Sequence, residues 1–290
     1  MSDHGPLHGP LLRALMEARG DVPPSLARFD ALVRSDGPPP SFEEYSARMG
    51  AALCPWRQTC YFDARARRRL TSVANARFEK IAADLGVSIP ASFWRFLAKR
   101  GAHGSEVREV VLGMEATVPL RLKYYLVFRG PAASTVEALR VALGAPELPA
   151  TLHMGSVCIL GLDFHPCGLH DFKVYVRLDS RRLPHVIENF ADFRALAVGC
   201  RYLVFQHCVV SRRRQVYFHA NSPAVLEDHL ALDPRAEGAR GSLADTLARM
   251  NRRLEGRDAG VLRPWIASFV YRQGALEATP ANIYFHLGRG

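Results

Sequence analysis

The chain has 290 residues, of which 48% are hydrophobic and 23% charged, and its formal net charge is +10. This length and composition allow one large domain or two small ones, with ample apolar surface for a core. Because the sequence has no uncharged apolar run of about 18 residues, a membrane-spanning helix is excluded. The net charge favours an anionic partner, although Arg runs such as 65–69 and 212–214 are typical of solvated loops or turn flanks.

The segment 1–10 is polar and lacks the basic and apolar pattern of a signal peptide. Six cysteines show no C-x-x-C pair and no ligand spacing typical of zinc. We therefore expect reduced thiols in a cytoplasmic protein without a metal site of its own and without a membrane partner. The cysteines are Cys54, Cys60, Cys158, Cys167, Cys200 and Cys208.

The first part of the chain contains proline breaks at 23–24 and 38–40, with a helix predicted on either side. We predict a helical or flexible segment over residues 1–40 and a single domain over residues 41–290. The stretch 54–62 is typical of a strand. Its hairpin partner is predicted near 70–78, although the Ala and Arg content of that stretch is equally typical of a helix.

From residue 107 onward the pattern alternates between β-hairpins and helices. Pro119 and the Pro166-Cys167-Gly168 triplet mark two of the hairpin turns. The predicted strands are 107–117 with 120–128, 157–165 with 172–178, 202–210 with 215–219, and 264–271 with 282–287. The predicted helices are 135–143, 183–197, 224–232 and 242–254.

These hairpins repeat a residue signature. The second strand of four hairpins carries a tyrosine, and two of the only four lysines in the chain lie two residues before it. Residues two apart in a strand share a face, so polar and aromatic side chains gather on one face and apolar ones on the other. The residues on the polar face are Lys123 with Tyr125, Lys173 with Tyr175 and Arg177, Tyr217 with His219, and Tyr284 with His286.

The helices must cover the apolar face, so the polar face looks either at water or into a shared interior. Closing the sheet removes the two edges that an open sheet of about ten strands would have to protect. We therefore predict an α+β fold, a ten-stranded antiparallel β-barrel with helices outside and a solvent-filled lumen lined by Lys, Arg, Tyr and His. The alternative is an antiparallel sheet with one wet face.

Such a lumen suits one kind of reaction. Lys and Arg side chains in a partly desolvated cavity need an anion, and a diphosphate provides several charged oxygens. Tyrosine ring faces stabilise a nearby cation. An anion clamp and an aromatic cage together allow diphosphate to leave an allylic carbon while the rings shelter the cation from water.

At these residues the chain resembles the ABBA-type prenyltransferases, and especially the branch that modifies ribosomal peptides, the cyanobactin peptide prenyltransferases. The resemblance implies a ten-stranded barrel ringed by helices, a dimethylallyl or geranyl diphosphate donor accompanied by Mg²⁺, and a side chain of a cyclic peptide as acceptor. We also expect a monomer. The resemblance rests on Ala76-Arg77-Phe78, Leu122-Lys123, Gly161-Leu162-Asp163-Phe164, Val216-Tyr217-Phe218-His219, Ile283-Tyr284-Phe285 and the spacing from Trp265 to Tyr284.

The resemblance also implies roles for individual residues. Arg77, Lys123 and Lys173 would bind the diphosphate, and Arg177 joins them because it shares the face of Lys173. The prenyl chain would be shielded by Tyr125, Tyr175, Tyr217, Tyr284 and His219.

The family places a glutamate on its first strand as general base or acceptor anchor, whereas here Arg57 stands near the expected position. Glu115 is the substitute candidate for the catalytic carboxylate. The alternative for Glu115 is an ordinary exposed carboxylate at a strand end. A nucleophile such as an indole carbon would need little help from a base.

Two other functions remain open at this point. A small-molecule phenol or indole could be the acceptor in place of a peptide, and the sequence does not separate the two. A single-stranded nucleic-acid binder also combines basic and aromatic residues on strands. Against it, the signature faces one common side and no RNP or KH motif is present, so we expect no nucleic-acid partner.

Overall fold

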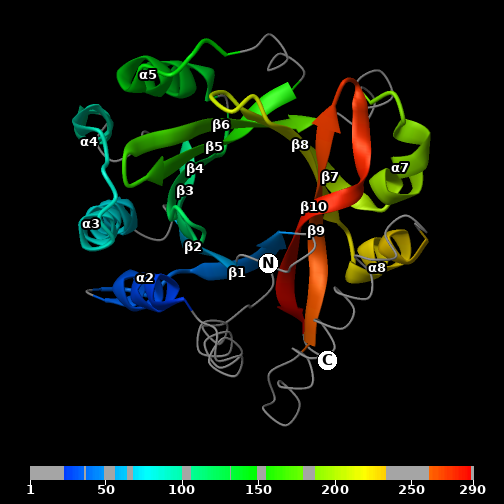
Figure 1. Cartoon of the computed structure of the whole chain (residues 1–290), viewed down its shortest axis with the longest axis horizontal. Coiled ribbons are helices and arrows are strands. Elements are labelled where there is room, and N and C mark those ends of the chain that lie inside the picture. The colour runs from blue at the N-terminus through cyan, green and yellow to red at the C-terminus, as the bar shows by residue number, and fades with distance from the viewer. Residues whose placement is uncertain are drawn as a thin grey trace.

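The structure of the protein, a computed structural model, describes residues 23–35, 37–48, 56–63, 68–99, 106–130, 132–148, 155–178, 187–232 and 261–288. Ten antiparallel strands form a closed barrel, which Figure 1 shows in a view into the ring. The strands are β1 (Phe42–Arg48), β2 (Trp56–Asp63), β3 (Val107–Glu115), β4 (Arg121–Phe128), β5 (Gly155–His165), β6 (Gly168–Leu178), β7 (Cys200–Cys208), β8 (Arg214–Ala220), β9 (Val261–Arg272) and β10 (Ala275–Gly288).

Each strand pairs with its neighbour in the chain, and β1 pairs with β10 to close the ring, with Ser46 opposite Tyr284. Closure gives every strand two hydrogen-bonded neighbours and leaves no sheet edge to protect. The predicted α+β fold with a ten-stranded barrel is confirmed. The alternative of an open sheet with one wet face is wrong.

Six described helices lie outside the ring (Figure 1). Four of them cover β1 to β6 on one side, and the other two cover the side formed by β7 to β9. The helices are α2 (Pro24–Arg34), α3 (Arg68–Asp84), α4 (Ala91–Lys99), α5 (Ala133–Leu143), α7 (Phe190–Val198) and α8 (Pro223–Leu232). None of the described helices is long and apolar enough to cross a membrane.

The hydrophobic core lies between these helices and the outer face of the barrel. On one side, Phe78 of α3 and Phe93 of α4 pack on Tyr124 of β4, with ring centroids 5.0 and 5.1 Å apart. On the other side, Phe193 of α7 packs on Phe269 of β9 at 5.0 Å. The apolar alternate positions of the strands therefore face outward, as the periodicity predicts, and the polar positions are left for the lumen.

Odd and even strands run in opposite directions, so the connections between them alternate between the two ends of the barrel. The tight turns of the β3–β4, β5–β6, β7–β8 and β9–β10 hairpins lie at one end, which we call the turn end. The helical connections lie at the other, which we call the helix end. The position of a luminal residue along its strand therefore decides which of the two ends its side chain lies near.

The N-terminal part of the barrel differs from the sequence-based prediction. The stretch 70–78 belongs to α3 and not to a strand, and the partner of β2 is β1, which was not predicted. Helix α4 was also missed. Helix α2 packs into the same core cluster as α3 and α4, and the division of the chain after residue 40 stays a prediction.

Two predicted helices fall partly or wholly outside the described residues. Helix α7 begins at Phe190, and the preceding 179–186 lie outside the described part of the chain. The helix predicted over 242–254 lies outside it entirely. The five cysteines of the described chain, Cys60, Cys158, Cys167, Cys200 and Cys208, are free thiols.

Candidate active site

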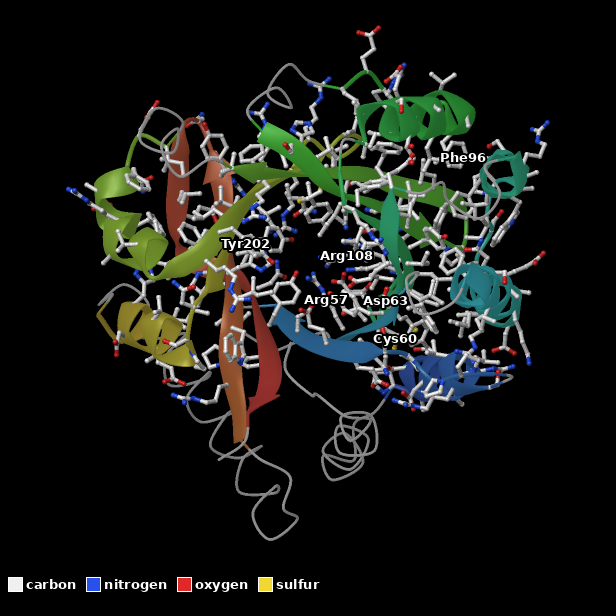
Figure 2. All side chains as sticks on the ribbon, turned by 180° about the vertical axis from the view of Figure 1, so that it is seen from behind. Arg57, Cys60, Asp63, Phe96, Arg108 and Tyr202 are labelled. Atoms are coloured by element: carbon white, nitrogen blue, oxygen red, sulfur yellow. The ribbon has the colours of Figure 1, made fainter. Side chains whose placement is uncertain are left out.

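A cavity of about 540 Å³ lies inside the barrel and reaches the turn end. This volume falls in the range of about 300–1,000 Å³ that is usual for small-molecule sites. Among the described residues that line it are eight Lys and Arg side chains and only three carboxylates. Figure 2 shows Arg57 and Tyr202 toward the interior of the ring, whereas Phe96 lies outside it on a covering helix.

Glu115 and Lys123 form a buried ion pair on the β3–β4 hairpin. Lys123 Nζ lies 2.8 Å from Glu115 Oε2, and Arg57 Nη2 lies 3.0 Å from Glu115 Oε1. Arg57 Nη1 also donates a hydrogen bond of 2.7 Å to Asn282 Oδ1, so this guanidinium bridges β2, β3 and β10. Burial would raise the pKa of Glu115, but the Lys123 and Arg57 cations hold that pKa well below its usual range.

This arrangement places Glu115 in the site but disfavours it as a base. A carboxylate with a strongly lowered pKa has little tendency to take up a proton. Nor is it an exposed strand-end group, because its side chain is 0% exposed. A catalytic role for Glu115 as general base stays a prediction, and the geometry makes it instead the anchor of Lys123 and Arg57.

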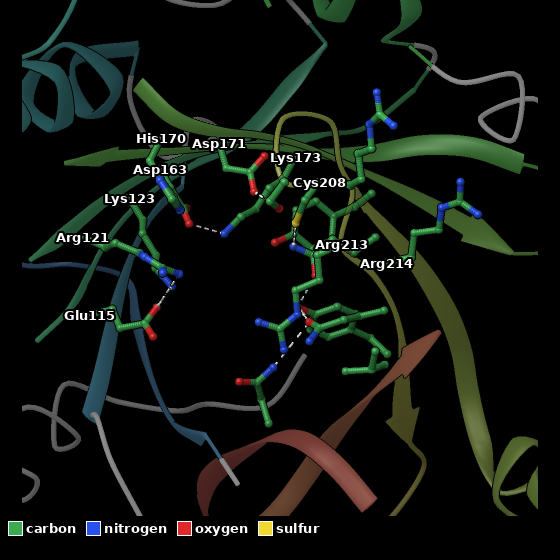
Figure 3. Close-up of a pocket in the computed structure, with 18 of the residues that line it drawn as sticks. Glu115, Arg121, Lys123, Asp163, His170, Asp171, Lys173, Cys208, Arg213 and Arg214 are labelled. Carbon is green, nitrogen blue, oxygen red and sulfur yellow. Dashed lines mark hydrogen bonds and ion pairs between the residues drawn. The ribbon is translucent and has the colours of Figure 1, made fainter. Parts of the chain in front are cut away.

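The β5–β6 hairpin repeats the same arrangement. Lys173 Nζ pairs with Asp163 Oδ2, and the Asp163 side chain is 0% exposed. Burial lowers the pKa of Lys173, but the neighbouring Asp163 carboxylate more than offsets it, so this pKa is raised overall. For Lys123 burial dominates, and with Arg57 nearby it lowers the pKa to about 8. Figure 3 shows both lysines and both carboxylates facing the same space.

A glycine lies two residues before each of these carboxylates, Gly113 before Glu115 and Gly161 before Asp163. A Cβ on Gly161 would lie 2.7 Å from two ring carbons of Tyr125 and 3.3 Å from a ring carbon of Tyr175. Such distances are shorter than normal van der Waals contact, so only glycine lets the two rings approach across β5. Gly113 stands at the matching place on β3, with Thr59 2.9 Å from its virtual Cβ.

The four predicted tyrosines form a continuous arc along the lumen. The ring centroids of Tyr125 and Tyr175 are 6.3 Å apart, those of Tyr175 and Tyr217 5.8 Å, and those of Tyr217 and Tyr284 5.9 Å. They come from β4, β6, β8 and β10, so every second strand contributes one ring. Burial raises the pKa of all four, which keeps them neutral phenols.

Three predicted site residues do not join this group. Arg77 lies on α3 outside the barrel, where its guanidinium is 5.5 Å from the centre of the Phe62 ring and donates to the Pro38 carbonyl at 2.9 Å. Its assignment to the diphosphate rested on a short motif that falls on a helix and not on a luminal strand. The geometry therefore corrects its placement.

Arg177 and His219 face the lumen side of their strands, but at the helix end. The Arg177 guanidinium lies 4.6 Å from the centre of the Tyr202 ring, and that ring stacks on His219 at 4.3 Å. Arg177 is four residues from Lys173 along β6, which corresponds to about 14 Å. The correct face was predicted, but the distance along the strand separates these residues from the cations at the turn end.

Sequence reasoning missed Arg213, which was taken for part of a solvated turn. Asp171 holds this β7–β8 turn by accepting hydrogen bonds from Val210 N at 3.2 Å and Ser211 Oγ at 2.6 Å. Arg212 has a φ of 57°, a conformation that a non-glycine residue adopts at a cost. Figure 3 shows Arg213 facing Lys173 across the cavity. The signal was its spacing, because it lies two and four residues before luminal side chains.

The amide of Gln215 is satisfied when its oxygen faces Arg213, which then donates to it from Nη2 at 2.6 Å and from Nε at 3.2 Å. Arg213 is therefore held in place by a neutral group. Lys123, Lys173 and Arg57 are held by carboxylates.

A second missed residue is Glu44 of β1, a buried carboxylate on the luminal side. Its Oε1 lies 3.4 Å from the Tyr61 hydroxyl and 3.5 Å from the Thr59 hydroxyl, and both partners share the face of Arg57 on β2. The adjacent Glu43 faces outward and pairs with Arg34 of α2 at 2.6 Å. Strict alternation over 42–48 would have placed Glu44 inside, had this stretch been read as a strand.

The described residues do not form a magnesium site of their own. Within the described parts of the chain no group of three or more His, Cys, Asp and Glu side chains could hold a metal ion. The two deepest carboxylates, Glu115 and Asp163, each already contact a lysine. A Mg²⁺ ion arriving with the donor would have to rest on the diphosphate oxygens, and it stays a prediction.

No protein-family model matches the sequence, and no curated protein is similar to it. Solved structures do match. Prenyltransferase PriB, solved with L-tryptophan and dimethylallyl thiolodiphosphate, superposes with a TM-score of 0.62 at 14% identity, over 96% of this chain and 94% of that one. The 5-dimethylallyltryptophan synthase from Streptomyces coelicolor gives 0.63 at 13%, over 98% and 96%. AnaPT from Neosartorya fischeri gives 0.51 at 13%, over 97% and 92%. The chain therefore has the barrel fold of these prenyltransferases along nearly its whole length.

Proposed function

We propose that this protein is a prenyltransferase that moves a dimethylallyl or geranyl group from its diphosphate onto an aromatic side chain, with a tryptophan residue of a peptide as the acceptor. The observation that carries this proposal is the cationic group at the turn end lying over a continuous arc of four tyrosine rings, inside one cavity of the barrel. The similar solved structures add support, because one is named 5-dimethylallyltryptophan synthase and another was solved with L-tryptophan and dimethylallyl thiolodiphosphate.

The diphosphate would be held by Lys123, Lys173, Arg57 and Arg213. Each of these cations is fixed by a neighbour on the protein, so little reorganisation is needed when the donor binds. Charge-assisted hydrogen bonds to phosphate oxygens are the strongest that such side chains make. The clamp would therefore act on the leaving group, where negative charge develops.

The allyl group would extend from the clamp over the tyrosine arc. A desolvated ring face stabilises a cation by about 2 kcal/mol. Because the phenols are neutral and buried, they offer ring faces without offering a strong nucleophile. The surrounding barrel wall would limit the access of water to the cation.

In the transfer, the C–O bond to the diphosphate breaks and its electron pair leaves with the diphosphate. An electron pair from the indole π system forms the new C–C bond, and the ring then loses a proton to restore aromaticity. We assign Glu44 as the group that accepts this proton, because its carboxylate faces the lumen beside Tyr61. The cations that hold Glu115 disfavour it for this step.

The finer assignments are a peptide acceptor and a dimethylallyl or geranyl donor in a cytoplasmic, monomeric enzyme. The second candidate acceptor is free tryptophan, which the names of the similar structures favour. A nucleic-acid partner fits the geometry poorly, because the tyrosines lie edge-on or tilted to one another inside the barrel and not along an open groove.

The test is to incubate the protein with dimethylallyl or geranyl diphosphate and with tryptophan, linear peptides or cyclic peptides, and to follow product masses. We expect one prenyl group on tryptophan-containing peptides. Lys123→Met should weaken donor binding while leaving Glu115 paired with Arg57, and Lys80→Met on the exposed surface of α3 is the control. No transfer to any acceptor, or equal donor binding by both variants, would contradict the proposal.

A further inference from the structure

A second cavity, of about 560 Å³, lies at the helix end of the barrel, and none of the roles above uses it. It is bounded by the end of β6, the helix α7 and the start of β7. Three arginines line it, Arg177, Arg194 and Arg201, and all three side chains are exposed. The described lining residues include no carboxylate, so this cleft is strongly cationic.

One of the three guanidiniums is held in advance. Arg177 lies over the face of Tyr202, which in turn stacks on His219, so β6, β7 and β8 each contribute one layer. A stacked guanidinium keeps its N–H groups in the plane at its edge, which suits two-point bonding to a carboxylate. Tyr202 also packs against the luminal cluster of Tyr175 and Tyr217, which fixes the position of the stack on the barrel.

The rest of the cleft is apolar. Val198 at the end of α7 is 78% exposed, and Leu203, Phe190 and Ala197 complete the wall. An apolar wall beside three cations can contact the uncharged neighbours of an anionic group. The volume suits a ligand of several residues, and a single carboxylate ion would leave most of it empty.

This cleft is not an extension of the diphosphate clamp. Arg177 and Lys173 are four residues apart on one strand, so their Cα atoms are about 14 Å apart. The tyrosine arc lies between them. One donor therefore cannot occupy both.

We propose that the cleft binds an acidic peptide segment, a stretch of Asp or Glu side chains with apolar neighbours, that belongs to the acceptor but lies away from the prenylated residue. That this segment belongs to the acceptor rests on the proposed function, whereas the binding of an acidic peptide to the cleft does not. Nucleic acid is the less suitable partner, because its evenly spaced phosphates call for a stripe of cations and not an apolar wall.

The test compares two charge reversals of the same kind. Arg194→Glu changes the cleft, and Arg95→Glu changes an exposed arginine of α4, another nine-residue helix on the far side of the barrel (Figure 1). A fluorescein-labelled peptide of alternating Glu and Leu, and the same peptide with Gln for Glu, are titrated with each protein without donor. We expect Arg194→Glu to weaken binding of the acidic peptide about tenfold, as for reversal of a close charge pair, and Arg95→Glu to leave it within twofold.

Equal weakening by the two variants, or equal affinity for the acidic and the Gln peptide, would overturn the proposal. A single-stranded oligonucleotide that binds the cleft more tightly than the acidic peptide would also overturn it, in favour of a phosphate-binding surface.

Transfer to a short peptide without acidic residues is measured in parallel. We expect Arg194→Glu to leave this transfer unchanged and to raise only KM for an acceptor that carries an acidic extension. If the wild-type protein transfers no prenyl group, the proposed function fails while the binding result still stands. If it transfers normally and KM does not respond, the inference about the cleft fails alone.

Discussion

The buried pair of Lys173 and Asp163 allows stability and donor binding to be measured separately. In Lys173→Met, the Asp163 carboxylate stays 0% exposed and loses its partner. Breaking a buried pair by removing one member costs about 3–5 kcal/mol. Lys123 is near enough to lower the pKa of Asp163 as well, so we place the cost near the lower end, about 3 kcal/mol. Urea unfolding should show this loss directly.

The double variant Asp163→Asn with Lys173→Met removes both charges. Replacing both members of a buried pair is often close to neutral for stability, so most of the lost free energy of unfolding should return. The affinity for the diphosphate donor should stay low in the double variant. A lost charge-assisted hydrogen bond costs about 1.5–3 kcal/mol, which raises the Kd for dimethylallyl diphosphate about tenfold to a hundredfold in both variants.

The two measurements together decide the role of Lys173. Donor binding is followed by titration with the diphosphate at a temperature where both variants are folded. If the double variant recovers donor affinity along with stability, Lys173 serves the fold and not the donor. The proposed clamp would then be wrong.

Three further outcomes follow from other contacts. Glu44→Gln should lower kcat with little effect on the donor Kd, whereas Glu115→Gln should mainly raise that Kd by loosening Lys123; the reverse pattern would exchange the two assigned roles. Because the pKa of Lys123 is lowered to about 8, its charge is present below that pH, and kcat/KM should fall as pH rises through it; a flat profile to pH 10 would contradict this. Gly161→Ala should cost about 1–3 kcal/mol and reduce turnover by displacing a tyrosine ring, whereas Gly130→Ala, with open space around its virtual Cβ, should change neither.

Much of the barrel could be predicted because its hairpins repeat. From residue 107 onward, alternation with period two fixes which face of each strand is polar, and the matching Lys123 and Lys173 show that the faces are shared. Strands of a closed barrel have a single interior, so this pattern was enough to bring Tyr125, Tyr175 and Tyr284 together.

The first hairpin could not be predicted in the same way. Strand β1 carries Glu43 and Glu44 side by side, and one of them is neutralised from outside by Arg34 of a helix that only the tertiary structure brings there. A strand whose outer face is charged lacks the apolar alternation on which the prediction depended. Because β1 was not predicted, Glu44 was missed as well, and the stretch 70–78 was predicted to be the partner of β2.

Position along a strand was the other limit. The spacing assigns Lys173 and Arg177 to the same face of the strand. It does not say that Lys173 joins the cations at the turn end of the lumen and that Arg177 lies at the helix end. Arg213 shows the converse, because a turn that looks solvated in sequence is pinned by Asp171 and directs its side chain inward. Hydrogen bonds between distant segments decide such cases, and they are not encoded in any local pattern.

The carboxylates inside this cationic cavity follow from the same electrostatics. Lysines and arginines in a low-dielectric interior would repel one another in the absence of donor, and an unpaired buried charge is costly. Glu115 and Asp163, placed on the strand beside each lysine, reduce that cost and hold the ammonium groups in position. They also lower the net positive charge of the inner clamp, so that Lys123, Lys173 and Arg57 together exceed their two carboxylates by one charge only. A diphosphate carries more negative charge than this, and Arg213, held by an amide, is one of the further cavity cations that can supply the remainder.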